Sequence, residues 1–385
     1  MRAAEWRKTM SAVGIIFSNL HDKNIAELTR QRTMASVPFG CRYRLIDFTL
    51  SNMVNSGITH VGVITHYNYQ SLMDHIGSGK DWDLARRSGG VQILPPYITA
   101  FSNSANFLYN TRMEALKSIN SFITNCKEDY VVLSDCDVIC NIDLSAILET
   151  HVRSGADATF IVKRSYLTKE LKAPTVVMES DENGRLTGVE EYSGNKSGYA
   201  DVSLNIWVTQ RRFLEDSVLD AAAHGYDDFT NDVIKRNLYA YNFRVYPCSD
   251  YFASVHSLTD YYMCSMDLLD ANVRRQLFDV KSRPIYTKIR NSPPTVYSRE
   301  GIVKNSLVAD GCLIEGTVEN SILFRGVKVG KGTHIRNSIL MQDTLTGENV
   351  YLNCVITDKD VVLRDGRVLS GHETMPFYIR KGSIV

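Results

Sequence analysis

Short apolar runs alternate with helical patterns over the first two thirds of the chain. Residues 13–17 predict a strand, and residues 43–56 predict a helix whose apolar positions recur at helical spacing before Gly57. Further strands are expected at 60–65 and 130–133, and further helices at 111–123 and 144–153. This alternation predicts a mainly parallel sheet with helices on both faces. Ligands are therefore expected just after Phe17 and Leu133, beyond the carboxyl ends of two strands.

The spacing of apolar residues changes in the last third of the chain. A polar stretch at 282–300 holds three prolines and predicts a linker. Beyond it, apolar residues recur every sixth position, at Cys312 and Val318, at Leu323, Val329, Ile335 and Met341, and at Val350, Ile356 and Val362. A second ladder overlies the first, at Asn305-Ser306, Asn320-Ser321, Asn337-Ser338 and Asn353-Cys354. The two periods favour a hexapeptide β-helix over a sandwich of short strands.

Four segments follow from these patterns. We expect an extension at 1–10, an α/β domain at 11–281, the linker at 282–300 and a β-helix at 301–385. A chain of 385 residues fits two domains, and 44% hydrophobic residues can fill their cores. Forty-three basic and 43 acidic residues balance, which argues against a nucleic-acid partner.

The remaining composition places the chain away from membranes. No apolar run approaches the roughly 18 residues of a membrane span, and the first ten residues are too polar for an export signal. The eight cysteines form no CxxC pair. We therefore expect buried, reduced thiols in a cytoplasmic protein.

One long motif resembles a known family. Residues 37–58 read VPFGCRYRLIDFTLSNMVNSGI and resemble the signature of glucose-1-phosphate adenylyltransferases (ADP-glucose pyrophosphorylases). Residues 319–341 are also similar to that family. The resemblance implies a Rossmann-like, mixed-sheet nucleotidyltransferase domain of GT-A type, followed by a left-handed parallel β-helix. It also implies the reaction of ATP with glucose 1-phosphate to give ADP-glucose and pyrophosphate, which feeds glycogen synthesis.

The nucleotide loop of that family is altered here. The family has a glycine-rich GGxGTRL loop, in which backbone N–H groups approach phosphate. Residues 18–25 contain no glycine, and none occurs between Gly14 and Gly40. Met34 stands where the family's RAKPAVPFG segment carries a lysine. A phosphate cradle of the usual kind is therefore not expected.

The family's Mg²⁺ site is reduced to one carboxylate. Asp137 matches the first metal-binding aspartate by its distance to Asp143, whereas Ser254 replaces the second. Because Mg²⁺ prefers oxygen ligands, chiefly carboxylates, we expect none to be bound here. Asp135 and Asp137 also form a D-x-D at a strand end, which leaves a metal–nucleotide pair open beside a capping or solvated role.

The sugar-phosphate positions show the same change. Resemblance assigns substrate contacts to Tyr109, Asn110, Thr111 and Ser203, but Met113 replaces the family's aspartate and Tyr192 its lysine. The motifs that belong to the fold persist, whereas the charged residues of the substrate sites have changed. This pattern resembles the non-catalytic partner subunit of this enzyme in Firmicutes. We expect a chain that is inactive or nearly so alone and modulates a catalytic chain, assembled as a heterotetramer.

Three further possibilities stay open. The basic residues Arg30, Arg32, Arg42, Arg44, Arg325 and Lys328 could form an anion pocket between the domains for a sugar-phosphate effector, or simply pair with acids across the interface. The chain could instead be an active nucleotidyltransferase or glycosyltransferase that uses a metal at Asp135 and Asp137. It could also be a sensor without partners.

Overall fold

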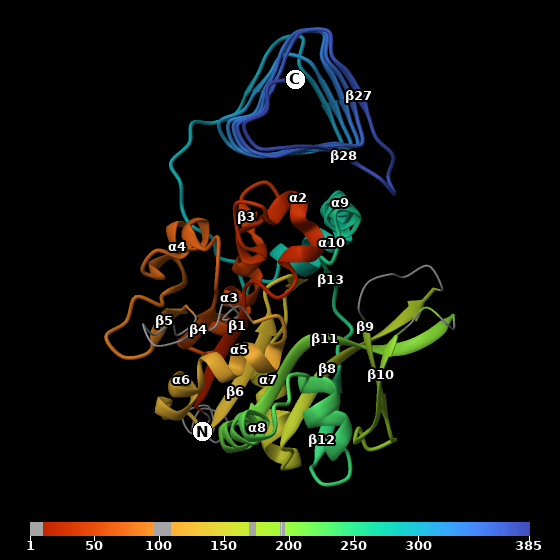
Figure 1. Ribbon diagram of the computed structural model, residues 1–385. Coiled ribbons are helices and arrows are strands. Elements are labelled where there is room, and N and C mark those ends of the chain that lie inside the picture. The colour runs from red at the N-terminus through yellow and green to blue at the C-terminus, as the bar shows by residue number, and fades with distance from the viewer. Residues whose placement is uncertain (1–10, 96–108, 169–174, 193, 195–196) are drawn as a thin grey trace.

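The computed structural model describes residues 11–95, 109–168, 175–192, 194 and 197–385. The extension expected at 1–10 lies outside these residues. Figure 1 shows an α/β domain that carries the N-terminal part of the chain and, above it, a three-sided β-helix. The expected fold, a mixed-sheet α/β domain followed by a β-helix, is therefore confirmed.

A nine-stranded mixed sheet forms the centre of the α/β domain. Its order is β10-β9-β11-β6-β1-β4-β5, with β8 beside β11 and β12 beside β8. Pairing is parallel from β6 through β1 and β4 to β5, whereas β11 runs antiparallel to β6, β8 and β9. The strands are β1 (Ala12–Phe17), β4 (His60–Ile64), β5 (Gly90–Leu94), β6 (Tyr130–Asp135), β8 (Ala158–Leu167), β9 (Thr175–Ser180), β10 (Leu186–Tyr192), β11 (Gly198–Gln210) and β12 (Phe243–Pro247).

Helices cover both faces of this sheet. Alternate strand residues supply two cores, with Ile16 and Val132 in one and Ile15 and Leu133 in the other. The first core packs against α3 (Leu45–Asn55), α7 (Leu144–Ser154), α9 (Leu258–Asp267) and α10 (Ala271–Phe278). The second packs against α5 (Arg112–Ser118), α6 (Asn120–Asn125) and α8 (Arg211–His224). The single helix expected at 111–123 is two helices, because the backbone leaves the helical conformation at Ile119.

Three parallel five-stranded sheets make the β-helix. The first holds β14 (Val296–Tyr297), β17 (Leu313–Ile314), β20 (Lys328–Val329), β23 (Leu345–Thr346) and β26 (Val362–Leu363). The second holds β15 (Ile302–Lys304), β18 (Thr317–Glu319), β21 (His334–Arg336), β24 (Tyr351–Asn353) and β27 (Val368–Ser370). The third holds β16 (Leu307–Val308), β19 (Ile322–Leu323), β22 (Ile339–Leu340), β25 (Val355–Thr357) and β28 (Phe377–Ile379). Because β14 is already paired, the β-helix begins inside the stretch expected to be a linker.

The asparagine ladder forms corners of the coils, with one correction. Asn305, Asn320 and Asn337 have φ of 40°, 46° and 46°, a left-handed conformation that asparagine tolerates better than most residues. The equivalent corner of the next coil is Cys354, with φ of 51°. Asn353 lies instead on β24, in register with Arg336. The predicted pair Asn353-Cys354 was therefore out of register by one residue.

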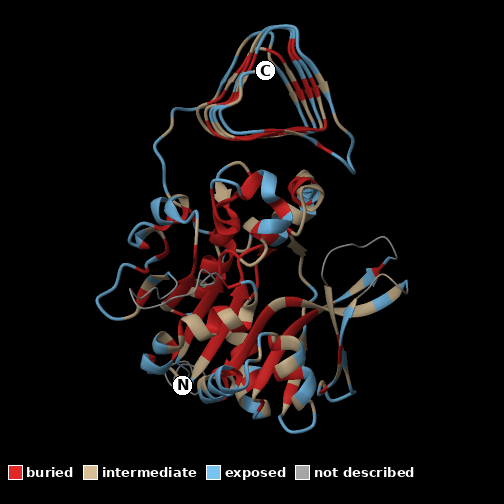
Figure 2. Ribbon diagram, in the orientation of Figure 1, coloured by how far each residue is buried: buried red, intermediate tan, exposed pale blue. Residues whose placement is uncertain are grey.

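One face of the β-helix packs on the α/β domain. Ile322, Ile339 and Ile356 stack on successive coils and share a core with helices α3 and α9. The Tyr262 hydroxyl on α9 donates to the Asn337 carbonyl at 2.8 Å, which joins the two domains through a backbone corner. Figure 2 shows buried residues on this lower face of the β-helix and on the helices below it.

The residues just before β14 pack on the α/β domain and do not form a free linker between the domains. The amide of Asn55 donates to the Pro284 carbonyl at 2.9 Å, and the Tyr286 N–H donates to Ser51 at 2.9 Å. Trp82 is buried, with its ring against that of His75. All eight cysteines are free, and six of them are buried. Among the described residues, no helix combines the length and apolar character needed to cross a membrane.

Candidate functional site

Three segments meet beyond the carboxyl ends of β1 and β6. Strand β6 ends at Asp135, and the chain reaches Asp137 before β7 (Val138–Cys140) begins. β7 pairs antiparallel with β13 (Phe252–Ser254), so that Ser254 lies opposite Val138, and the Val255 N–H donates to the Asp137 carbonyl at 3.1 Å. This pairing brings His256 beside Asp137, while His21 arrives from the segment after β1.

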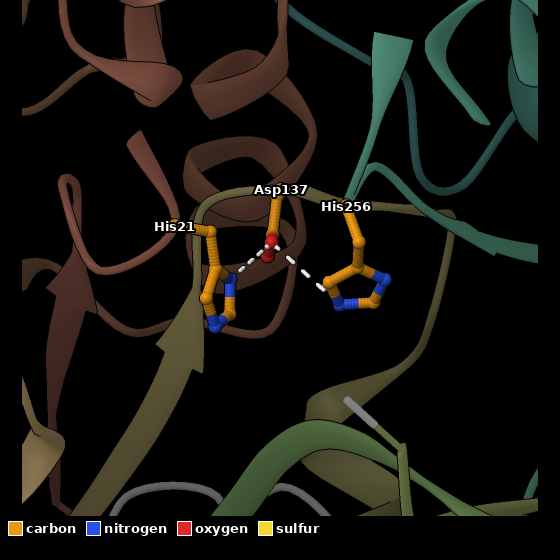
Figure 3. Close-up of side chains that lie close together, drawn as sticks. All are labelled: His21, Asp137 and His256. Carbon is orange, nitrogen blue, oxygen red and sulfur yellow. Dashed lines mark hydrogen bonds and ion pairs between the residues drawn. The ribbon is translucent and has the colours of Figure 1, made fainter. Parts of the chain in front are cut away.

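The two histidines face one carboxylate oxygen, as Figure 3 shows. The Nδ1 atom of His21 lies 2.5 Å from Oδ2 of Asp137, and Nε2 of His256 lies 4.0 Å from the same oxygen. Asp137 is buried, and its Oδ1 atom has no hydrogen-bond partner among the described residues. Ser254 contacts the ring of His256 rather than Asp137, with its hydroxyl 3.3 Å from Nδ1.

The ionisable side chains of the site shift the pKa values of one another. Burial opposes ionisation of Asp137, but the neighbouring imidazoles outweigh it and lower the pKa of this carboxyl to about 2. Burial also disfavours the charged form of His21, but the Asp137 carboxylate raises the pKa of His21 above its usual value. A close pair with His21 therefore holds the one carboxylate that matches the family's first metal ligand.

Asp135 does not join Asp137 in a two-carboxylate site. Its carboxylate accepts two hydrogen bonds from the Arg112 guanidinium, one of them from Nε at 3.1 Å. The same guanidinium lies over the Trp207 ring, 5.8 Å from its centroid. Each aspartate of the D-x-D thus has its own cation, an arrangement that the sequence did not indicate.

The segment after β1 is filled by its own side chains. Asp22 is buried, accepts from the Asn19 amide at 2.6 Å and accepts from the Met34 N–H at 2.7 Å. Asn19 also accepts from the Thr65 hydroxyl at 2.8 Å. Burial raises the pKa of Asp22 to about 7. A carboxyl group therefore takes up a backbone N–H in the region where a phosphate-binding loop would offer its donors.

The residues present do not fit Mg²⁺. This ion needs several oxygen ligands in octahedral geometry and usually takes one or two carboxylates with substrate phosphates. Ser254 contacts His256, Asp135 is bound by Arg112, and the two side chains that face the Asp137 carboxylate are imidazoles.

The expected sugar-phosphate contacts have local partners. Tyr109 is buried with its ring 4.5 Å from that of His66, and the Asn110 side chain accepts from Lys23 at 2.8 Å. Thr111 caps α5 by accepting from the Glu114 N–H at 3.1 Å. Ser203 accepts from the Asn205 N–H at 3.2 Å within β11. These four residues stabilise the fold around the cleft, and any contact with substrate stays a prediction.

A second candidate site lies between the domains. A pocket lies there with a cavity volume of about 30 Å³, and it is partly open to solvent. Basic side chains from both domains line it, and no carboxylate does so among the described residues. The lining cations are Arg42, Arg44, Lys288, Arg290, Arg325 and Lys359. Burial, with Arg44 and Arg32 nearby, lowers the pKa of Lys359 to about 7.

Only part of the expected anion set meets in this pocket. Arg42 and Arg44 line it, and so does Arg325, which also pairs with Asp310 at 3.1 Å. Arg32 is instead buried and bonds both oxygens of Asp358 at 2.8 Å, which is the cross-domain pairing held open as the alternative. Lys328 is exposed on β20 and does not line the pocket, so its inclusion was wrong.

Sequence reasoning missed the residues that give each site its character. His21 and His256 were not singled out, although His256 lies two positions after the recognised Ser254. Lys288 and Arg290 lie in the expected linker, and Lys359 lies in a coil of the β-helix. No sequence pattern marks these last three residues, because the pocket joins segments that are far apart in the chain.

Comparison with known proteins agrees with this architecture. Residues 21–246 match the family described as nucleotidyl transferase, and residues 294–375 match the GlmU-like, C-terminal hexapeptide family. Hexapeptide repeats of this kind build left-handed β-helices, which assigns the hand of the C-terminal domain.

Individual relatives cover nearly the whole chain. The chain is 34% identical to the glycogen biosynthesis protein GlgD of Bacillus subtilis (strain 168) and 39% identical to that of Geobacillus stearothermophilus, over 97% of this chain and 96% of each relative. It is 36% identical to the glucose-1-phosphate adenylyltransferase of Clostridium acetobutylicum over 84% of each chain. Fold and matches thus place the chain among proteins with a nucleotidyltransferase-type domain and a hexapeptide β-helix. The chain belongs to the glucose-1-phosphate adenylyltransferase family, within which GlgD proteins are among its relatives.

Proposed function

We propose that this chain acts in glycogen biosynthesis as a non-catalytic subunit that modulates a catalytic glucose-1-phosphate adenylyltransferase. One observation carries the proposal: the buried Asp22 carboxyl accepts the Met34 N–H in the segment after β1. Phosphate is bound by free N–H donors and cations, and a carboxyl group in that place competes with it for donors. With that N–H taken up, and with described cleft residues that do not fit Mg²⁺, the barrier to adenylyl transfer stays high.

The interdomain pocket supports a regulatory role. Six cations without a lining carboxylate favour an anionic ligand, and the pocket touches both domains. A bound anion would therefore favour one relative placement of the two domains over others. We propose a sugar phosphate or an inorganic anion as effector, bound by Arg42, Arg44, Arg290 and Lys359.

The outer face of the β-helix supports a partner chain. Ile302, Tyr351 and Val368 lie on one ladder of the second sheet, together with Thr317 and His334. The three apolar members of the ladder are exposed. An exposed apolar ladder of this kind is typical of a surface that is covered by another subunit. We propose that it contributes to a hetero-oligomer with the catalytic chain, of tetrameric form.

The test compares the purified chain alone with the co-expressed pair. We expect no ADP-glucose from ATP, glucose 1-phosphate and Mg²⁺ with the chain alone, and a changed turnover or effector response of the catalytic chain when both are present. Tyr351→Glu with Val368→Glu should reduce co-purification, whereas Tyr239→Glu, at an exposed tyrosine of the α/β domain, should not. Robust activity of the isolated chain would overturn the proposal.

An active enzyme with a metal at Asp135 and Asp137 is the other candidate. The Arg112 guanidinium that binds Asp135 counts against it, because a metal ion would have to displace that cation. Mn²⁺-dependent nucleotide binding that Asp137→Asn abolishes would favour this alternative.

A further inference from the structure

Three potential metal ligands converge where the family's Mg²⁺ chemistry does not fit. One ligand atom each from His21, Asp137 and His256 lies within 4.8 Å of the others. The three side chains come from three different segments and point toward a common centre in Figure 3. Two nitrogens with one carboxylate oxygen form a donor set that suits zinc and related ions better than magnesium.

Two buried atoms of the cluster have no hydrogen-bond partner among the described residues. They are Oδ1 of Asp137 and Nε2 of His256. Burying such atoms without a partner is costly, and native structures rarely do so without a functional reason. A cation bound between the two residues would satisfy Nε2 of His256, and would also satisfy Oδ1 where the Asp137 carboxylate binds the ion through both oxygens.

Ser254 orients His256 for this role. Its hydroxyl lies 3.3 Å from Nδ1 of His256, on the side of the ring away from Nε2. When Nδ1–H donates to the hydroxyl, the lone pair remains on Nε2 and faces Asp137. Histidine ligands of metals are commonly oriented in this way by a hydrogen bond from the second ring nitrogen. The loss of a carboxylate at position 254 thus coincides with the gain of an oriented imidazole.

The two distances to Oδ2 of Asp137 lie on either side of the ligand–ligand distance expected in a zinc site. With bonds of about 2.0–2.1 Å in tetrahedral geometry, two ligand atoms of one ion lie roughly 3.3 Å apart. The His21–Asp137 contact of 2.5 Å would have to open by less than about 1 Å, and the His256–Asp137 contact of 4.0 Å would have to close by a similar amount.

We propose that His21, Asp137 and His256 bind a divalent ion of the zinc class, with the fourth position open to water or a small anion. Metal binding requires neutral imidazole ligands, so the proton shared by His21 and Asp137 is released to solvent. The ion would cross-link the segment after β1 to the segment between β13 and α9. A fold position that matches a magnesium site in catalytic relatives would then hold a resident structural ion.

Zn²⁺ titration of the metal-stripped full chain tests this proposal, with a chromogenic chelator as competitor and thermal unfolding as a second readout. We expect one equivalent of Zn²⁺ to bind, to raise the unfolding temperature, and to resist competition by millimolar Mg²⁺. Asp137→Asn and His256→Gln should each weaken binding by more than about 100-fold, and Ser254→Ala by about 10-fold.

His60→Asn is the matched control, because His60, Cys126 and Glu128 form the other cluster of potential ligands among the described residues. We expect it to leave Zn²⁺ affinity unchanged. An anomalous difference map of zinc-soaked crystals locates the ion even if a variant fails to fold. Zinc at His60, or no stoichiometric binding by the unmodified chain, overturns the proposal.

Discussion

The cleft of the α/β domain and the pocket between the domains differ in whether their charged side chains are paired. In the cleft, Asp135 is bound by Arg112 and Asp137 by His21, so each carboxylate has a cation of its own. In the pocket, Arg42, Arg290 and Lys359 make no ion pair among the described residues. Internally paired carboxylates have little charge left for a ligand, whereas unpaired cations leave a site that an anion can complete.

This difference also separates Arg32 from its neighbours in sequence. Arg32 and Asp358 are both buried and form a closed pair across the domain interface. Arg42, ten residues later, faces the pocket. Basic residues of similar appearance in the sequence therefore have different roles, one structural and the other available to a ligand.

The largest effect should follow from breaking the closed pair in the cleft. Arg112→Met leaves the buried Asp135 carboxylate without its cation, which should lower the free energy of unfolding by about 3 kcal/mol. Denaturant unfolding measures this. Arg153→Met, in an exposed pair with Glu149, is the control and should cost less than about 0.5 kcal/mol. A loss below that level for Arg112→Met would show that the cleft does not depend on internal pairing.

An intermediate effect should appear in the pH dependence of anion binding. The Lys359 ammonium is charged below its pKa of about 7 and neutral above it. Sulfate, whose charge is constant near neutral pH, should therefore bind the pocket about tenfold more tightly at about pH 6 than at about pH 8. Calorimetric titration measures the affinity. Lys359→Met should remove most of the pH dependence, and sulfate affinity that is equal at both pH values in the unmodified chain would contradict the role of Lys359.

The smallest stability effect is expected at Arg42. Its guanidinium is exposed and makes no ion pair among the described residues, so Arg42→Ala should change the free energy of unfolding by no more than about 0.5 kcal/mol. The same variant should weaken sulfate binding several-fold. A stability loss comparable to that of Arg112→Met would place Arg42 in a closed pair and erase the distinction between the two regions.

Much of the fold could be predicted from the sequence because local periodicity determines it. The six-residue apolar spacing predicted the β-helix, and Val329, Ile335 and Met341 are all buried as expected. The register error at Asn353 arose because an Asn-x dipeptide does not reveal that the corner falls one residue later, at Cys354. The start of the β-helix was missed because β14 is two residues long and is defined only by its pairing with β17.

The sites were less predictable because they depend on side chains brought together by folding. The resemblance drew attention to Asp137 and Ser254, and the structure places both in one corner of the sheet. It gave no reason to select His21 or Arg112, whose roles follow from the approach of β1 and α5 to the end of β6. Lys359 and Arg290 belong to a surface that exists only when the two domains pack.

The most direct test of the account is a calorimetric titration of ATP with Mg²⁺ into the isolated chain. Because the segment after β1 is occupied by Asp22 and Asp137 is held by His21, we predict no saturable binding at millimolar nucleotide. Saturable binding that requires Mg²⁺ and is lost in Asp137→Asn would show that the cleft still holds the nucleotide and its metal ion, and would contradict the account.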